Sequence, residues 1–195
     1  MALERFFQKK TLPSLNNLPP GISDALFLTF WKDGKNLEDR SKYSLNLRAS
    51  RDKWEGFIHW ETPDGIKLIR EGHIIAGLGF SREKESLVVR QIQGGVNRKL
   101  ELSAIKWERL LLAAAIEVAR INNLSHVEVA PAGSSQWQGT GFLSSLFEKR
   151  LPAVKLMTMK LRYEVTPERM GFKLAQNGNR IISIANWDMR RPKAR

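Results

Sequence analysis

The sequence contains no cysteine, and this absence removes several kinds of chemistry. Disulfide bonds, thiolate metal sites and cysteine nucleophiles are all excluded. Long apolar runs are missing as well, because no stretch approaches the roughly 18 apolar residues of a membrane span. Residues 1–10 also lack the apolar core of a signal peptide. We therefore expect a soluble cytoplasmic protein that has no membrane partner.

Acidic side chains are few relative to basic ones. The chain has 32 Lys plus Arg against 20 Asp plus Glu, a formal net charge of +12. Residues 141–195 hold 12 basic and 4 acidic side chains, a net charge of +8. Such a surplus attracts polyanions, among them nucleic acid, ribosomal RNA, anionic lipid and phosphorylated cofactors. The same surplus would also simply keep a soluble protein dispersed.

Several well-known catalytic motifs are missing too. The sequence has no phosphate-binding P-loop, no Gly-x-Gly-x-x-Gly after a strand and no serine-hydrolase elbow. Its histidines, His59, His73 and His126, lie far apart, and none has a second histidine at the spacing of a helical metal site. We expect hydrogen-bonded structural histidines and no bound metal.

What the sequence does contain favours one α/β domain. Its 195 residues are 42% hydrophobic, enough for a real core. Residues 1–23 are rich in Pro and Asn and predict a loosely held arm, residues 24–188 the domain, and residues 189–195 a basic tail. Strands are predicted at 25–31, 43–48 and 73–80, with a hairpin of 56–61 and 66–70 around residues 62–65. Together they predict an antiparallel meander.

The central stretch predicts a strand, a helix and a second strand. Residues 86–92 are β-branched and apolar, residues 103–122 have helical spacing with Ser103 as a plausible N-cap, and residues 126–130 form a short strand. Two strands joined by such a helix are most economically parallel neighbours with a right-handed crossover. Ligands usually bind beyond the carboxyl ends of such strands.

The last third is less regular. It predicts a short helix at 142–150, either a strand or a helix at 154–163, and a single helical turn at 166–171 that has Pro at its start and Gly after its end. Asn177-Gly178 predicts a two-residue hairpin between flanking strands.

The end of the central strand carries the motif Gln91-Ile92-Gln93-Gly94-Gly95-Val96. It resembles the phosphate-binding motif of the GNAT superfamily of N-acetyltransferases, Gln/Arg-x-x-Gly-x-Gly/Ala; Gln91 and Gly94 match, and Val96 stands where Gly or Ala is expected. The resemblance implies a GNAT-like mixed sheet in which backbone amides of these residues hold the pyrophosphate of acetyl-CoA or another acyl-CoA. As a competing interpretation, Gly94-Gly95 is a plain structural turn.

The same resemblance suggests an acid and a base for transfer of an acyl group to an amine. The segment 169–173 looks like the family's terminal Tyr-x-x-x-Gly-Phe, but Pro167 replaces the tyrosine, so Tyr163 is the nearby candidate for the general acid. A base must deprotonate the attacking amine. Glu128, between two valines, is the first candidate and His126 the second, although an alternating strand would also allow Glu128 to face solvent.

A binding module without catalysis, on the same fold, is the alternative function. Basic side chains would contact the phosphates of a nucleic acid or of the ribosome, and aromatic rings would stack on unpaired bases. The basic candidates are Arg150, Lys155, Lys160, Arg162, Arg169, Lys173, Arg180, Arg190, Arg191, Lys193 and Arg195, and the aromatic candidates are Tyr163, Phe172 and Trp187.

Overall fold

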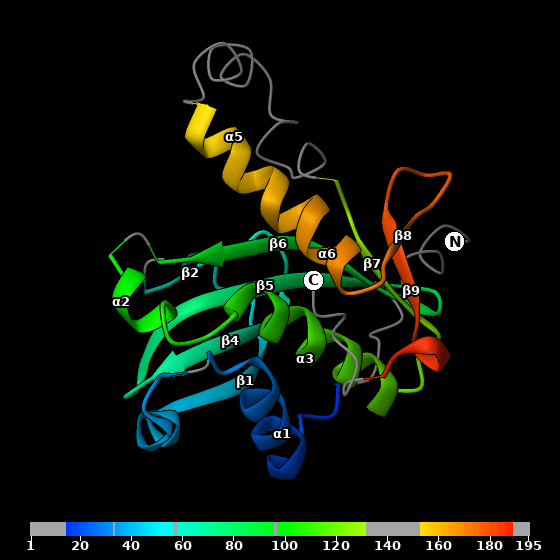
Figure 1. Ribbon diagram of the computed structural model, residues 1–195. Coiled ribbons are helices and arrows are strands. Elements are labelled where there is room, and N and C mark those ends of the chain that lie inside the picture. Colours follow the sequence, from blue (N-terminus) through cyan, green and yellow to red (C-terminus); the bar gives the residue numbers. More distant parts are fainter. Residues whose placement is uncertain (1–14, 33, 57, 96, 132–152, 189–195) are drawn as a thin grey trace, which may run out of the picture.

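A computed structural model of the chain describes residues 15–32, 34–56, 58–95, 97–131 and 153–188, and these form a mixed α/β structure (Figure 1). Its main sheet has seven strands in the order β1-β4-β5-β6-β7-β9-β8. The strands are β1 (Tyr43–Ala49), β4 (Asp64–Arg70), β5 (His73–Glu83), β6 (Ser86–Gly94), β7 (His126–Val129), β8 (Lys173–Leu174) and β9 (Arg180–Ser183). All neighbours are antiparallel except β6 and β7, which are parallel. The predicted α/β class and the parallel pair are confirmed.

Helices and a small second sheet complete the fold. The helices are α1 (Pro20–Phe30), the 3-10 helix η1 (Leu37–Lys42), α2 (Lys99–Leu102), α3 (Trp107–Ile121), α5 (Ala153–Lys160), the π-helical turn η3 (Leu161–Val165), α6 (Thr166–Arg169) and the 3-10 helix η4 (Ile184–Asn186). The second sheet pairs β2 (Trp54–Glu55) with β3 (Ile58–His59). Over the described ranges, no helix combines the length and the apolarity needed to cross a membrane.

The main core lies between one face of the sheet and the helices α1 and α3 (Figure 1). Along α3, every side chain from Leu110 to Ala119 is buried, because this helix packs against the sheet and also against α1, α6 and η4. Leu78 and Phe80 of β5 face it and are fully buried. A buried Leu, Ile or Phe side chain contributes about 1.5–3 kcal/mol, so this layer is a major source of the stability of the fold.

On the opposite face of the sheet lies the ring of Trp60, the residue immediately after β3. A Cβ placed on Gly77 would lie 2.6 Å from the Trp60 ring, and one on Gly65 would lie 2.7 Å from it. The indole therefore sits directly on the glycine backbone. Consequently β3 lies across the face of the sheet and pairs with β2, while β4 pairs with β1 and β5. The predicted hairpin of 56–61 with 66–70 is wrong for this reason.

The prediction of a strand at 25–31 is also wrong, since these residues belong largely to α1. Pro20 is the first residue of the helix, where its missing N–H and fixed φ suit the first turn. Residues 20–23, expected in the arm, are thus the first turn of α1. Leu26, Phe27 and Phe30 are its buried side and lie at the spacing of a helix.

The central helix begins later than its sequence predicts. Ser103 caps the carboxyl end of α2 instead of opening α3, and its hydroxyl donates to the carbonyl of Leu100. The following residues are extended because they pair with the end of α1: Lys32 N–H donates to Ala104 O and Lys106 N–H to Phe30 O. This long-range pairing, which local periodicity does not reveal, delays the start of α3 to Trp107.

The carboxyl-terminal part settles the open choice at 154–163, which is helical. The chain continues from α5 through η3 into α6, with Pro167 in the first turn of α6 and Gly171 at φ 94° after its end. A hairpin around Asn177-Gly178 is confirmed, as β8 pairs with β9, but its loop is longer than the predicted two residues because Leu174 pairs with Arg180 and Ala175 N–H donates to Asn179 O at 2.8 Å. The helix predicted at 142–150 lies outside the described residues.

The contact between Trp60 and Gly77 yields a stability prediction. We expect Gly77→Ala to destabilise the fold by about 1–3 kcal/mol, because the added methyl group overlaps a ring that has no room to shift. Gly21→Ala is the matched control, since nothing lies within 4 Å of a Cβ there. Urea unfolding midpoints measure both; equal midpoints for Gly77→Ala and the wild type would contradict the packing described.

Candidate functional site

The parallel strands β6 and β7 are paired over only part of their length. Their register runs from Ser86 opposite His126 to Val89 opposite Val129, and Ala130 N–H donates to Val89 O at 2.9 Å. Beyond Val89, β6 continues to Gly94, and among the described residues β5 is the only strand that pairs with this part. The sheet therefore opens between β6 and β7 at their carboxyl ends, which is the place where ligands bind in many α/β folds.

A β-bulge in β6 lies at this opening. Gly79 of β5 pairs with Gln91 and Phe80 pairs with Val89, so Arg90 is an extra residue in β6. A bulge bends the strand that carries it and increases the local twist. Because the bulge coincides with the end of pairing to β7, it separates the two strands where the opening begins.

Tyr163 fills part of the opening and contacts the backbone of β6. Its hydroxyl oxygen accepts a hydrogen bond from Ile92 N–H at 2.8 Å. The tyrosine lies in the π-helical turn η3, and such turns occur frequently at functional sites. Burial raises the pKa of Tyr163, as does the charge of Glu61, while the Ile92 hydrogen bond and Arg162 oppose the rise. The phenol is therefore protonated at neutral pH.

Glu61 approaches the same place from the opposite face of the sheet. Its N–H donates to Oε1 of Gln91 at 3.0 Å, which fixes it beside the bulge. Burial raises the pKa of the Glu61 carboxyl, and Arg90 partly opposes this. Its charge acts on Tyr163, so groups from two different layers interact through the opening. The sequence does not reveal Glu61 as a site residue, because no motif contains it and only the folded sheet brings it close.

Arg162 anchors the π-helical turn to the start of α3. Its guanidinium carbon lies 5.0 Å from the centre of the Trp107 ring, and its Nε lies 3.8 Å from Oε1 of Glu108. Burial raises the pKa of Glu108, whereas its own N–H and the Arg162 charge lower it. These contacts hold η3 in place, and they therefore position the neighbouring Tyr163.

The predicted phosphate-binding motif is largely engaged within the fold. The Gln91 amide is 5% exposed and donates to His59 O at 2.6 Å and to Oε1 of Gln93 at 2.8 Å. Gly95 N–H donates to Ile75 O at 2.9 Å. A Cβ on Gly94 would lie 3.0 Å from Trp107, so this glycine permits close packing of the indole. Val96 lies outside the described residues.

The two residues predicted as the base lie on the part of β7 that is paired with β6, before the opening begins. Glu128 pairs with Val88 in the register of β6 and β7. At 3.3 Å per residue, Val88 lies about 13 Å before Ile92 along β6. Its Oε2 accepts hydrogen bonds from Asn179 at 2.7 Å and Asn177 at 3.4 Å. Burial raises the pKa of Glu128, but hydrogen bonds from Asn179, Ser86 and Asn177 outweigh this and lower it. A lowered pKa suits an anchor for the β8–β9 hairpin better than a base.

His126 lies still farther from the opening. It starts β7 opposite Ser86, at the amino end of the strand, about 20 Å from Ile92 at 3.3 Å per residue. Among the described residues, no three His, Cys, Asp or Glu side chains come together as a possible metal site.

The residues expected to bind nucleic acid do not form one free surface. Arg180 is buried, with its Nη2 2.7 Å from Glu168 Oε1 and 3.8 Å from Glu164 Oε2. Phe172 is buried, and Trp187 donates its indole N–H to Glu117 at 3.2 Å. Lys160, Arg169 and Lys173 are exposed. Arg150, Arg190, Arg191, Lys193, Arg195 and the side chain of Lys155 lie outside the described part of the chain.

Comparison with known proteins gives no relative from which to transfer a function. No family model matches the sequence, and no curated protein and no solved structure matches it. The geometry of the chain itself therefore carries the functional argument.

Opposite pKa shifts at Glu61 and Glu128 predict opposite pH effects. Because the folded pKa of Glu61 lies above its ordinary 4.5, its stabilising contribution is complete below pH 4.5 and is lost as the pH rises. Because the folded-state pKa of Glu128 lies below 4.5, its contribution to stability is present above pH 4.5 and is lost as the pH falls.

We therefore expect Glu61→Gln to lose less stability than the wild type as the pH rises from 4.5 to about 7. Glu128→Gln should instead lose less than the wild type as the pH falls below 4.5. Urea denaturation at a series of pH values measures both. A Glu61→Gln profile parallel to that of the wild type would show that this carboxyl is not buried as described.

Proposed function

We propose that the protein is an acyl-CoA-dependent N-acyltransferase with a GNAT-like fold, using acetyl-CoA or another acyl-CoA and an amine acceptor. One observation carries the proposal: a backbone amide and a protonated tyrosine meet where β6 and β7 part, with a carboxylate of raised pKa nearby. The element order also supports it, since an antiparallel meander, a helical crossover between parallel strands and a late hairpin follow the order that the resemblance implies.

Acyl transfer needs three groups, and each has a candidate at the opening. Ile92 N–H can donate to the thioester carbonyl oxygen, in the position where it now donates to Tyr163. Glu61 can take a proton from the attacking amine, because its raised pKa brings it closer to neutrality. Tyr163 can give its proton to the departing thiolate. The C–N bond forms, the C–S bond breaks, and the proton lost by the amine is balanced by the one given to sulfur.

The phosphates of the acyl-CoA fit the predicted motif less well. Gly95 N–H is already bound to Ile75 and the indole of Trp107 covers Gly94, so these glycines do not supply the cradle. In our proposal, Lys99, the first residue of α2, and Lys106, the residue before α3, hold the phosphates instead, and both are exposed. Gly94 and Gly95 then have structural roles only: Gly94 allows the indole of Trp107 to pack closely, and Gly95 lies in the turn after β6.

The alternative proposal, polyanion binding without catalysis, rests on Lys160, Arg169 and Lys173. It differs in its response to salt, because contacts to nucleic-acid phosphates weaken steeply as salt rises. Its predicted stacking partners are engaged within the fold, and for this reason we place the acyltransferase first.

Binding of acyl-CoA tests the proposal directly. At about a hundred times its dissociation constant, acetyl-CoA should stabilise the protein by about 2.7 kcal/mol, which for a chain of this size raises the melting temperature by about 5–10 °C. Differential scanning fluorimetry measures this. The absence of any shift with acetyl-CoA and with longer acyl-CoA thioesters at millimolar concentration would reject the acyltransferase, and a shift given only by RNA or single-stranded DNA would support the alternative.

Paired variants then identify the base in an assay of thiol release from acetyl-CoA with primary amines. Glu61→Gln should lower kcat about 100-fold or more, the usual range for loss of a general base, while Glu128→Gln should retain activity. The reverse result would assign the base to Glu128.

A further inference from the structure

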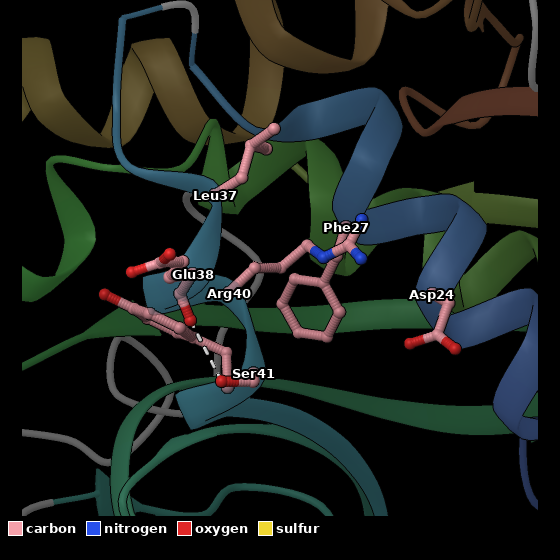
Figure 2. Close-up of a pocket in the computed structure, with 7 residues that line it drawn as sticks. Asp24, Phe27, Leu37, Glu38, Arg40 and Ser41 are labelled. Carbon is pink, nitrogen blue, oxygen red and sulfur yellow. Dashed lines mark hydrogen bonds between the residues drawn. The ribbon is translucent and has the colours of Figure 1, made fainter.

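A pocket of about 410 Å³ lies between α1, η1 and the start of β1 (Figure 2). It is distinct from the proposed acyl site, since β4 and β5 separate β1 from β6 in the sheet. Nothing in the acyltransferase proposal uses it. Its lining is chemically mixed, and three features of that lining together define what it can hold.

The first feature is a guanidinium that lacks an acceptor. Arg40 lies beside Phe27 in the pocket, and its Nη1 is buried without a hydrogen-bond partner (Figure 2). Among the described residues, no carboxylate forms an ion pair with Arg40. A buried N–H without an acceptor is unfavourable, and buried polar groups in native proteins are usually satisfied. Arg40 as a whole is only half-buried, so a ligand with an anionic acceptor can approach the rest of the guanidinium and offset the cost of the buried Nη1.

The second feature is a pair of carboxylates, Asp24 and Glu38, that lie on either side of the Arg40 guanidinium (Figure 2). Neither forms an ion pair within the part of the chain that the structure describes. They give the pocket a net negative charge, so a simple anion would be repelled. A simple cation would leave the guanidinium without an acceptor. A ligand with one charge of each sign matches both.

The third feature is an apolar floor. The rings of Phe27 and Tyr43 lie 6.3 Å apart between centres, and both residues are buried. The Tyr43 hydroxyl donates to Glu101 O at 2.9 Å, and its ring also meets Trp31 edge-on and carries the Arg70 guanidinium at 5.5 Å, so only part of the ring faces the pocket. Leu37, 59% exposed, stands at the edge. An apolar side chain on the ligand would cover these groups.

From these three features we infer that the pocket binds a small zwitterion with an apolar side chain, that is, a free α-amino acid of the leucine or phenylalanine type. The ligand carboxylate accepts from Arg40, the ammonium group pairs with Asp24 or Glu38, and the side chain lies on Phe27 and Tyr43. The inference does not depend on acyl transfer, so each proposal can fail alone.

Isothermal titration with three matched probes tests this inference. L-Leucine carries both charges, leucinamide lacks the carboxylate, and N-acetyl-leucine lacks the ammonium group. We expect L-leucine to bind and both analogues to bind about tenfold more weakly or worse, because each loses one charged hydrogen bond. Arg40→Gln should weaken L-leucine by a similar factor, and Arg51→Gln, an exposed arginine outside the pocket, should not.

A measurement without ligand separates a binding role from a structural one. If Arg40 has no partner in the free protein, Arg40→Gln should keep the melting temperature within about 2 °C of the wild type or raise it. A loss of several degrees would mean that Arg40 stabilises the fold through an internal partner, and this would overturn the inference. Equal affinities of leucine and its two analogues, or no binding of leucine or phenylalanine at tens of millimolar, would overturn it as well.

Discussion

Hydrogen bonding of the β6 backbone is the constraint on which the rest of the site depends. Up to Val89, β6 has a strand on each side, and beyond Val89 the described part of the chain supplies only β5. Buried backbone amides must nevertheless find acceptors. At Ile92 that acceptor is the Tyr163 hydroxyl, a side chain in the place of a missing strand. The Tyr163 side chain can move aside so that a ligand oxygen accepts the Ile92 N–H in its place. The backbone carbonyl of a neighbouring strand cannot move aside in this way.

The contacts around this hydrogen bond follow from the same constraint. Tyr163 reaches β6 because η3 is held against the start of α3, where Arg162 lies over Trp107 and near Glu108. Trp107 in turn requires Gly94, since a side chain there would meet the indole. From the other face, Gln91 holds Glu61 beside the bulge. Residues from four separate segments thus converge on the opening between β6 and β7.

Local sequence patterns predict the parts of this fold that depend on neighbours in the chain. The strands from Tyr43, His73 and Ser86, the β7 strand and the Asn177-Gly178 hairpin are confirmed because alternation and turn chemistry are local. The strand predicted in place of α1 is wrong because Ala25–Trp31 is apolar on nearly every side, so its period is ambiguous. The late start of α3 is set by pairing with Phe30 and Lys32, far away in the sequence.

The site was predictable to a similar degree. The motif points to the end of β6, and the resemblance suggests Tyr163 as a substitute acid, but the hydrogen bond of Tyr163 to Ile92 depends on a π-helical turn that no sequence pattern predicts. The sequence does not reveal Glu61, because its environment comes from the bulge in β6 and from the way β3 and Trp60 lie across the sheet. Topology alone favours Glu128 as the base, whereas the register places it opposite Val88, on the paired part of the strands.

Amide hydrogen exchange at Ile92 tests the central claim most directly. If the Tyr163 hydroxyl is the acceptor of this amide, Tyr163→Phe should speed its exchange at least about tenfold, whereas the Ala130 amide, bound to Val89, should be unchanged. Saturating acetyl-CoA should restore the protection in the variant. Equal exchange of Ile92 in the wild type and in Tyr163→Phe would contradict the account, because the amide would then have another acceptor and no ligand oxygen could take its place.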